Sequence, residues 1–496
     1  MTAQNDTAPS SSRPLGVLDR YFHITERGST LGREMRGGLA TFFAMSYIIV
    51  LNPLIIGAAE DSTGHYLGGG TEPNLPAVAA ATSLISGLLT ILMGIIGKFP
   101  MAVSSSLGLS AFVTYGIVVL PGMTWADAMG LVVIEGFILL ILVLTGFRSA
   151  IFNAVPSPLK VAISVGIGLF IALIGMMNAG FIQNSGGAGL ELGVGGFVFG
   201  WPLLIFLVAL FALFVMWSAD VRGAILYSII TATVLAITIE SLLTVGPRTD
   251  DDGEVVNEYG WDLNVPTLDQ DWITAPDLGL LGEFNLLGSW ESVGLVAATL
   301  LIFTLLLANF FDLLGTMVGV SNTGDIKDEQ GEIPYSRRIM VADALGTMGG
   351  GAGGTSVNSG FIESTVGVGD GARTGFANVI TGLLFLATIV LAPLAALVPT
   401  EAASATLVLV GFLMMQQITR IDWKDVEIAI PAFMTLVMMP FSYSITNGIG
   451  AGFVTYVLIK VLRGKFREVH PLMYVTAALF VLYFVSGPIQ DALGVS

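Results

Sequence analysis

The chain of 496 residues contains no cysteine and few charged residues. The absence of cysteine excludes disulfide bonds, thiolate metal sites and cysteine nucleophiles. Charged residues make up 11% of the chain, against about 25% in soluble globular proteins, which excludes an ordinary soluble protein. The histidines His23, His65 and His470 all fall in predicted loops or tails, and the glycine-rich run 349–354 lacks a following Gly-Lys-Ser/Thr. We therefore expect no metal, no phosphate-binding loop and no cofactor.

Long apolar runs are what the sequence has instead, because 54% of its residues are hydrophobic. Continuous runs of about 20 apolar residues predict membrane-spanning helices, whereas a barrel would show short alternating segments. Seven runs precede the loop 246–290 and seven follow it, and a further run at 471–487 is interpreted as an interfacial helix. The fourteen predicted spans lie near 37–58, 76–97, 103–121, 127–147, 157–177, 201–218, 222–245, 292–320, 339–354, 356–369, 376–398, 404–418, 427–445 and 446–462.

Basic residues predict the orientation of these spans, because lysine and arginine in short loops stay on the cytoplasmic side. A single threading places the N-terminal arginines, Lys98, Arg148, Arg222 and the cluster at 460–467 inside. The loop 246–290 carries ten acids and one arginine, for a charge of −9 out of −17 for the chain, and is predicted to lie outside. We expect a multi-pass plasma-membrane protein whose cytoplasmic tail, residues 1–36, is disordered.

Short sequence matches indicate an internal repeat between the two halves. Because seven spans separate equivalent positions, such a repeat has opposite orientations in the membrane, as in many secondary transporters. Residues 103–121 and 356–369 are predicted to be the broken spans, since they are short and rich in glycine and serine. The matches are Leu39–Phe43 with Leu307–Phe311, Ser104–Ser110 with Val357–Glu363, and Val155–Ser157 plus Gly168 with Val398–Thr400 plus Gly411.

A charge within a membrane span is costly and usually faces a functional cavity. Four carboxylates of the predicted spans are therefore candidates for a functional role: Glu135, Asp312, Asp343 and Glu363. Asp312 and Glu363 both come from the second repeat and are predicted to converge on one binding site. The alternative for each is a structural hydrogen bond to a neighbouring helix. For Glu135 we favour a packing hydrogen bond, and for Asp343 a contact with the helix dipole or with Arg337–Arg338.

Several motifs carry a resemblance to a known family. The stretch Gly37–Pro53 (GGLATFFAMSYIIVLNP) closely resembles the first-span signature of the azaguanine-type purine permeases. These belong to the nucleobase:cation symporter family, which also contains the uracil and xanthine permeases. Phe310–Thr316 resembles the eighth-span pattern of that branch, and segments between Ala342 and Gly375 resemble its ninth and tenth. Matching segments run from about residue 34 to 487.

The resemblance implies an all-α polytopic membrane protein with 14 transmembrane segments, arranged as 7+7 inverted repeats with short strands in segments 3 and 10. It also implies an elevator-type homodimer in which a core domain moves as a rigid body against a gate domain. The implied division is a core of residues 37–147 and 291–398, a gate of residues 148–245 and 399–462, the acidic extracellular loop 246–290, and a cytoplasmic or interfacial C-terminal segment, 463–496.

In the family, the acids of spans eight and ten hold the nucleobase, and these positions correspond here to Asp312 and Glu363. The resemblance and the span reading together predict a site completed by Ser110, Thr316, Phe361, Ile362 and Asn309. Because burial penalises the charged form of a carboxyl group, either acid is a candidate for coupling proton flow to transport. The branch usually has Asn in place of Ser110, Pro-Gly in place of Ser105–Ser106, a second Asp in place of Asn309 and Asp-Thr in place of Asp312–Leu313.

The predicted function is proton-coupled uptake of nucleobases, with adenine, guanine and hypoxanthine as the expected substrates. The departures at Ser110 and Asn309 leave the choice of base open. The alternatives are the same fold carrying xanthine, uracil or a small organic anion, or a channel or exchanger. We expect neither an enzyme nor a nucleic-acid-binding protein.

Overall fold

The computed structural model of the chain describes residues 16–146, 155–184, 189–221, 223–250, 255–268, 272–328 and 331–485. Within these residues, nine helices are long and apolar enough to cross a membrane, and one bent helix pair makes a tenth. Helices satisfy their own backbone hydrogen bonds, which is the condition for crossing lipid. The chain is therefore a multi-pass integral membrane protein.

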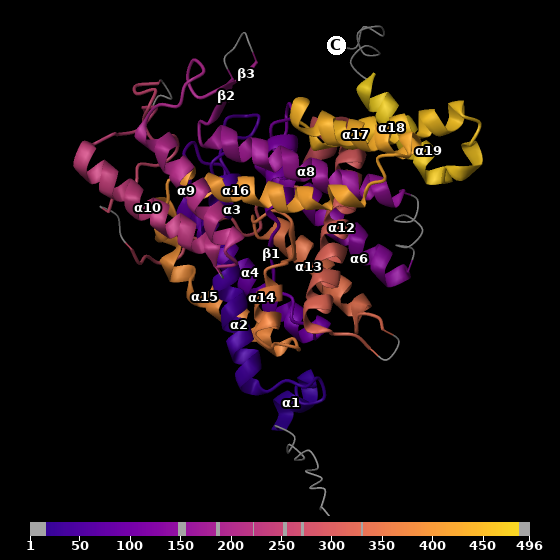
Figure 1. Ribbon diagram of the computed structural model, residues 1–496, viewed down its shortest axis with the longest axis horizontal. Helices are drawn as coiled ribbons and strands as arrows, with labels where there is room; N and C mark the ends of the chain where they lie inside the picture. Colours follow the sequence, from indigo (N-terminus) through magenta and orange to yellow (C-terminus); the bar gives the residue numbers. More distant parts are fainter. Residues whose placement is uncertain are drawn as a thin grey trace, which may run out of the picture.

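In the described part of the chain, seven segments precede the acidic loop, residues 246–290; Figure 1 shows how they are arranged. Local signals start several of them: the Asn74 side chain caps the second segment, Thr124 forms a capping box with Asp127 in the fourth, and proline opens the fifth and sixth. The segments are α2 (Leu31–Met45) with α3 (Ile48–Ile56), α4 (Leu75–Gly97), β1 (Val103–Ser105) with α5 (Leu107–Phe112) and the π-helix Val113–Val118, α6 (Trp125–Thr145), α8 (Ser157–Asn178), α9 (Trp201–Ser218) and α10 (Ala224–Leu243).

Seven segments follow the acidic loop, which confirms the seven-plus-seven arrangement. They are α12 (Gly294–Gly324), α13 (Ser336–Ala352), β4 (Asn358–Gly360) with α14 (Ser364–Gly369), α15 (Phe376–Ala387) with the 3-10 helix Ile389–Leu397, α16 (Thr400–Met415) with the 3-10 helix Gln416–Arg420, α17 (Val426–Phe441) and α18 (Ile445–Leu462). The eleventh segment bends by 66° between its two helices. Shorter elements complete the described chain: α1 (Gly16–Phe22), β2 (Ile182–Asn184), β3 (Leu190–Leu192), α11 (Gly288–Ser292), the 3-10 turn Phe466–Glu468 and α19 (Pro471–Phe484).

The two broken segments meet in an antiparallel strand pair. Val103 pairs with Gly360, Ser104 with Ser359 and Ser105 with Asn358. All six residues are buried, so the ladder gives their backbone groups partners that lipid could not supply. The predicted strands in segments 3 and 10 are confirmed.

The helices separate into two groups by their contacts. The first helix group comprises α2, α4, α6, α13, α14 and α15, and the second comprises α8, α9, α10, α16, α17 and α18. Paired glycines bring backbones together in both groups, Gly87 with Gly382 in the first and Gly168 with Gly411 in the second; a Cβ atom on Gly411 would lie 2.4 Å from the Gly168 carbonyl oxygen. Gly168 lies on α8 and Gly411 on α16, at positions that the sequence match makes equivalent in the two repeats. The corresponding helices of the two repeats therefore pack against each other.

Residues 16–36 form α1, a turn and the start of α2, which corrects the prediction that this part of the tail is disordered. The α1 helix is followed by α2, whose buried Glu34 accepts hydrogen bonds from the backbone of Arg373 and Thr374 at 2.8 and 3.3 Å. The Tyr21 hydroxyl donates to the Ile95 carbonyl at 3.1 Å. These contacts hold the segment against the first helix group. The predicted tail residues 1–15 and the basic residues Arg148 and Arg222 lie outside the described residues.

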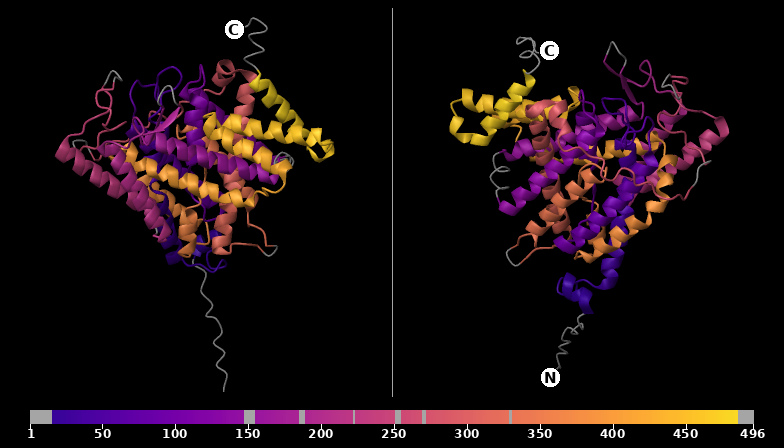
Figure 2. Two further views of the ribbon diagram at one scale, coloured as in Figure 1. Left: turned by 45° about the horizontal axis from the view of Figure 1, so that its top comes forward. Right: turned by 180° about the vertical axis from the view of Figure 1, so that it is seen from behind.

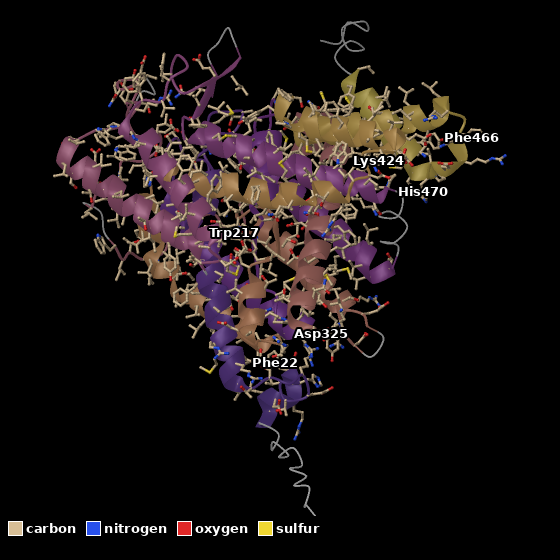
Figure 3. The ribbon with its side chains drawn as sticks, viewed as in Figure 1. Phe22, Trp217, Asp325, Lys424, Phe466 and His470 are labelled. Atoms are coloured by element: carbon tan, nitrogen blue, oxygen red, sulfur yellow. The ribbon has the colours of Figure 1, made fainter. Side chains whose placement is uncertain are left out.

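Within the predicted run 471–487, residues Pro471–Phe484 form the helix α19, whose 14 residues are too few to cross a membrane on their own. This helix contacts α18 and α12. α10 and α19 lie at opposite lateral edges of the molecule, and the β2–β3 hairpin lies at the end away from α1 (Figures 1 and 2). Figure 3 places Phe22 and Asp325 near the α1 end, whereas Lys424, Phe466 and His470 lie together beside α17 and α19.

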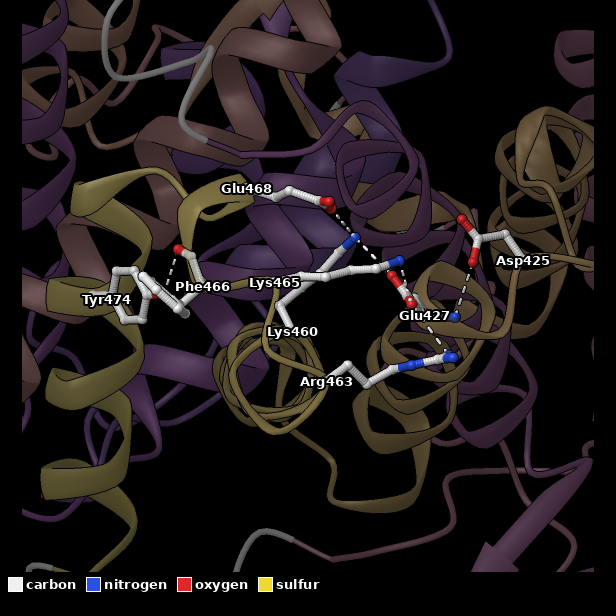
Figure 4. Close-up of polar contacts among 8 residues, drawn as sticks. All are labelled: Asp425, Glu427, Lys460, Arg463, Lys465, Phe466, Glu468 and Tyr474. Atoms are coloured by element: carbon white, nitrogen blue, oxygen red, sulfur yellow. Dashed lines mark hydrogen bonds and ion pairs between the residues drawn. The ribbon is translucent and has the colours of Figure 1, made fainter.

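One carboxylate holds the ends of α17 and α18 together (Figure 4). Glu427, with a side chain 6% exposed, accepts from the Lys460 Nζ at 2.8 Å, the Lys465 Nζ at 2.7 Å and the Arg463 Nη1 at 3.1 Å. Lys460 is itself buried and also contacts Glu468 at 2.7 Å, whose side chain is 55% exposed. Because a buried charge needs a buried partner, Glu427 is the central member of this cluster.

We expect Glu427→Gln to lower the thermal unfolding midpoint of the detergent-purified protein, because three cations lose their shared counter-charge. Glu468→Gln is the matched control: it removes an exposed partner of the same lysine and should lower the midpoint far less. The midpoints are measured by a thermal shift assay. Equal midpoints for the two variants would show that the buried Glu427 contributes no more to stability than the exposed Glu468.

Candidate functional site

The site is built where the strand pair ends and the half-helices begin. β1 leads into α5 through Ser106, and β4 leads into α14 through Phe361, Ile362 and Glu363. The long helix α12 passes beside both, with contacts to β4, α14 and α5. Side chains from three segments therefore meet at one place, as expected of a transporter with broken helices.

Asp312 faces this place from α12. Its Oδ2 accepts a hydrogen bond from the Ser106 hydroxyl at 3.2 Å. The carboxylate is half-buried, and one turn further on Gly315 borders open space. Asp312 therefore has one protein partner and an accessible side.

Glu363 is the residue directly before α14, at its N-cap position, and its side chain is also half-buried. Its Oε1 accepts a hydrogen bond from the hydroxyl of Tyr47, which is itself buried. The helix α12, which carries Asp312, packs against α14, which begins directly after Glu363. The structure therefore brings together the two acids that the sequence selects.

Tyr47 and Ser106 are partners that the list of predicted site residues missed. Tyr47 lies at the junction between α2 and α3, where the first segment is interrupted. A tyrosine between two apolar helices at that interruption was the available signal. Ser106 stands at a position where the family pattern has glycine, and its hydroxyl is the partner of Asp312.

The other predicted residues surround the acids in different ways. Ser110 is fully buried on α5, and its hydroxyl has no partner among the described residues. Thr316 is buried one turn after Asp312. Phe361 is buried and its backbone N–H donates to the Ala102 carbonyl at 2.9 Å, whereas the Ile362 side chain is 45% exposed. Ser110 thus has a buried hydroxyl without a partner among the described residues, whereas Ile362 presents an exposed apolar side chain.

Asn309 takes part in a separate buried network. Its amide nitrogen donates to Glu135 Oε1 at 3.1 Å and to Thr347 Oγ1 at 2.9 Å, and all three side chains are fully buried. Both amide hydrogens of Asn309 are therefore used within the protein. Glu135 has the packing hydrogen bond that its sequence context predicts.

Asp343 does not pair with Arg337–Arg338 as the sequence suggests. It is fully buried, and its Oδ1 accepts from the Ser359 hydroxyl at 3.0 Å and from the Gly360 N–H at 3.1 Å. These contacts hold the strand β4 against α13. The prediction was wrong because α13 begins at Ser336, which puts Asp343 about two turns inside the helix and beside β4, a contact that sequence spacing does not show.

The assembled site offers two carboxylates and a neutral surrounding. Neither Asp312 nor Glu363 forms an ion pair with a described lysine, arginine or histidine. Carboxylates with open lone pairs accept hydrogen bonds strongly in a poorly hydrated site. This chemistry suits a neutral ligand with several N–H donors, and the described residues contain no group of three or more His, Cys, Asp or Glu side chains that could hold a metal ion.

Comparisons with known proteins place the chain in a family. The model of the Permease family (Xan_ur_permease) matches residues 32–451. The chain is 33% identical to the adenine permease AdeP of Escherichia coli (strain K12), over 98% of its own length and 99% of the relative. It is 34% identical to the guanine/hypoxanthine permease PbuG of Bacillus subtilis (strain 168), over 94% and 99%.

Solved structures confirm the fold. The transmembrane domain of the cyanobacterial bicarbonate transporter BicA aligns with a TM-score of 0.57 at 16% identity, over 85% of this chain and 97% of that one. SLC26A9 aligns with a TM-score of 0.59 at 13% identity, over 87% and 66%. The family match and the near-complete alignment to the permeases confirm the resemblance seen in the sequence motifs. This chain belongs to the Permease family and is a membrane transport protein, not an enzyme.

Proposed function

We propose that the chain imports purine nucleobases, adenine, guanine or hypoxanthine, across the plasma membrane together with protons. The observation that carries this proposal is the position of Asp312 and Glu363 beside the strand pair, each with a single side-chain donor. The names of the permease relatives, which specify adenine or guanine and hypoxanthine, support the same substrate class.

The geometry suggests how a base would be held. A purine edge presents ring and exocyclic N–H groups, which carboxylate oxygens accept in pairs. The unpartnered hydroxyl of Ser110 can reach a ring nitrogen or carbonyl directly or through a water molecule. We assign Asp312 and Glu363 as the main contacts, with Ser110, Thr316 and the backbone of Phe361–Glu363 around them. Asn309 acts through the Glu135 network, since its amide nitrogen is already paired.

The same two acids are our candidates for proton coupling. Two like charges that lie close together in a poorly hydrated place repel each other, and one proton shared by the pair relieves that repulsion. A base that binds by N–H donation interacts best with the remaining charged carboxylate. Binding of the proton and of the base would therefore support each other.

The two helix groups correspond to the proposed moving parts. We assign the first helix group to a core of residues 37–147 and 291–398, and the second to a gate of residues 148–245 and 399–462. A hydrogen bond of 3.0 Å from the Asn178 side chain of α8 to the Tyr115 hydroxyl joins the two parts. In this proposal the core moves against the gate as a rigid body and this contact opens.

The distribution of basic residues supports a cytoplasmic N-terminus and an external acidic loop. We also propose a homodimer formed through the second helix group. The helices α9 and α10 support it, because Phe211, Val215 and Val234 leave 61%, 66% and 56% of their surfaces exposed on one chain.

The central prediction concerns uptake into proteoliposomes. Radiolabelled adenine, guanine or hypoxanthine should enter faster with an inward proton gradient, and Asp312→Asn and Glu363→Gln should each lower kcat/KM at least about tenfold, because each removes a charge-assisted hydrogen bond. Xanthine and uracil belong in the same assay, since preference for either would correct the substrate.

Glu291→Gln provides the control for that assay, because Glu291 is an exposed acid of α11 outside the site. Uptake that survives both site substitutions, or that ignores the gradient in the wild type, would rule out the assigned roles of the two acids.

Tyr47 should act as a positioning residue for Glu363. We expect Tyr47→Phe to lower kcat/KM for the base about fivefold to tenfold, because Glu363 loses its one side-chain donor while the ring packing remains. Unchanged kcat/KM in a folded variant would show that the phenol hydroxyl does not orient the carboxylate.

The lack of native cysteine allows a direct test of the rigid-body movement. A short bifunctional thiol reagent that links Tyr115→Cys to Asn178→Cys should stop uptake, because it ties the core to the gate. The matched control links Ser164→Cys to Gln417→Cys, two positions within the gate whose side chains are 3.1 Å apart. Continued uptake by the cross-linked Tyr115–Asn178 pair would contradict the movement.

A further inference from the structure

The hydrogen-bond network around Glu135 leaves two buried oxygen atoms without partners. Glu135 on α6, Asn309 on α12 and Thr347 on α13 are all fully buried. Among the described residues, the Glu135 Oε2 and the Asn309 Oδ1 have no hydrogen-bond partner. A buried polar atom without a partner is costly, so the network is incomplete unless a further hydrogen joins these two atoms.

The far end of the network sets its direction. The Thr347 hydroxyl donates its hydrogen to the Asn358 carbonyl oxygen at 3.1 Å. Its oxygen can therefore only accept from Asn309, which it does at 2.9 Å, and the other amide hydrogen of Asn309 goes to the Glu135 Oε1 at 3.1 Å. The amide nitrogen of Asn309 thus serves Glu135 and Thr347, and its carbonyl oxygen remains as an acceptor.

Within the described chain, no cation balances a charge on Glu135. Its Oε1 is bonded to an amide and its Oε2 to nothing. Arg337 donates to the Leu144 carbonyl at 2.6 Å, more than two turns beyond Glu135 on α6. An ionised Glu135 would be desolvated and unpaired, which is strongly unfavourable. The helices packed against α6 carry these charged or titratable side chains: Asp312 on α12, Arg337, Arg338 and Asp343 on α13, Glu291 on α11 and Tyr115 on the π-helix.

Close packing beside Glu135 leaves little room for anything larger than a hydrogen. A Cβ atom on the next residue, Gly136, would lie 2.7 Å from the Met348 nitrogen and 3.0 Å from the Ala344 carbonyl oxygen. A Cβ atom on Gly351 would lie 2.8 Å from the carbonyl oxygen of Met129, earlier on α6. The helices α6 and α13 therefore approach backbone to backbone on both sides of Glu135.

The other fully buried acid of this region, Asp343, has more support for a negative charge. Its Oδ1 accepts from the Ser359 hydroxyl at 3.0 Å and from the Gly360 N–H at 3.1 Å, and donors of this kind favour the charged form of a carboxyl group. Glu135 has a single amide donor. Asp343 lies one turn before Thr347 on α13, so a second charge nearby would be repelled. When one of the two acids is neutral, it is Glu135.

We propose that Glu135 is a permanently protonated carboxylic acid whose Oε2–H donates to the Asn309 Oδ1. One proton turns Oε2 from an acceptor into a donor and gives both unpartnered oxygens a partner at once. Glu135 and Asn309 then form two hydrogen bonds in opposite directions, O–H to the amide oxygen and N–H to Oε1. We call this arrangement the acid–amide pair. It is electrically neutral and joins α6 to α12.

The acid–amide pair positions one of the site acids. Asn309 lies three residues before Asp312 on α12, about one turn away. Through Thr347 the pair is also bonded to Asn358 of the strand β4. It therefore fixes α12, and with it Asp312, against the strand pair. Glu135 is thus a positioning residue that keeps its proton. This role rests on the proposed function, which assigns Asp312 as a contact to the base.

Infrared difference spectroscopy tests the proton directly. The full chain is measured in detergent at about pH 8, where a glutamate in water is ionised, and neutral carboxylic acids and carboxylates absorb at different frequencies. Glu135→Gln should lose a neutral-acid band relative to the wild type. The control Glu291→Gln, at an exposed position, should lose carboxylate absorption instead. Loss of carboxylate absorption in Glu135→Gln would show an ionised Glu135, with bound water or a cation completing the network, and would overturn the proposal.

Uptake tests the positioning role. Glu135→Gln should keep kcat/KM for the base within about threefold of the wild type, because an amide can donate to the Asn309 Oδ1 and accept its N–H. Its uptake should still respond to the proton gradient. Glu135→Leu should lower kcat/KM at least about tenfold, because it leaves two polar atoms of Asn309 buried and unpaired. Loss of the gradient response in Glu135→Gln would show that Glu135 exchanges the coupled proton, and would overturn its permanent protonation.

Exchanging the two partners provides a rescue that does not depend on the folding of Glu135→Leu. Asn309→Asp alone places a second acid against Glu135 and should lower kcat/KM about tenfold. The double variant Glu135→Gln/Asn309→Asp reverses the pair, because the introduced aspartate can donate its proton to the introduced amide. We expect kcat/KM to recover to within about threefold of the wild type and the neutral-acid band to return. A folded double variant without recovery would overturn the direct pairing.

The remaining outcomes separate this inference from the proposed function. A wild-type protein that takes up no base would overturn the importer, while the infrared spectra would still decide the proton on Glu135. A neutral-acid band from Glu135 together with unchanged kcat/KM in Glu135→Leu would support the proton and overturn the positioning role.

Discussion

The structure depends on two strands of three residues each that pair inside the membrane-spanning part of the chain. Broken helices leave backbone groups that lipid cannot satisfy, and the ladder between residues 103–105 and 358–360 gives them partners. A half-helix follows each strand, α5 after β1 and α14 after β4. The ladder therefore brings Ser106, at the start of α5, and Glu363, at the start of α14, into the same region of the protein. The functional geometry is therefore a consequence of backbone hydrogen bonding.

The two repeats are alike in fold and unequal in chemistry. The second repeat supplies both acids, Asp312 and Glu363, whereas the first supplies hydroxyl donors to them, Ser106 and Tyr47. A symmetric arrangement with four acids at one place would concentrate repulsive charge in a poorly hydrated region. Pairing each acid with a neutral donor keeps the carboxylates in position and leaves acceptor capacity for a ligand.

The buried acids outside the site have a different task. Asp343 fixes β4 through Ser359 and Gly360, and Glu135 joins α6 to α12 and α13 through Asn309. Both are fully buried, whereas the site acids are half-buried. Exposure to an open side therefore distinguishes the carboxylates that can meet a ligand from those that hold the scaffold, a distinction that residue type alone does not make.

The sequence by itself determined the membrane class, the seven-plus-seven arrangement and the two broken segments, because apolar runs and glycine-rich breaks are local features. It also selected Asp312 and Glu363 as candidate site residues. Tertiary structure alone decided the partners. Tyr47 is 316 residues from Glu363, and Ser106 is 206 residues from Asp312. The same holds for Asp343, whose nearby arginines suggested the wrong partner, and for residues 16–36, whose polar composition concealed contacts with α4 and α15. Such contacts depend on how distant segments pack, and local sequence carries no record of that packing.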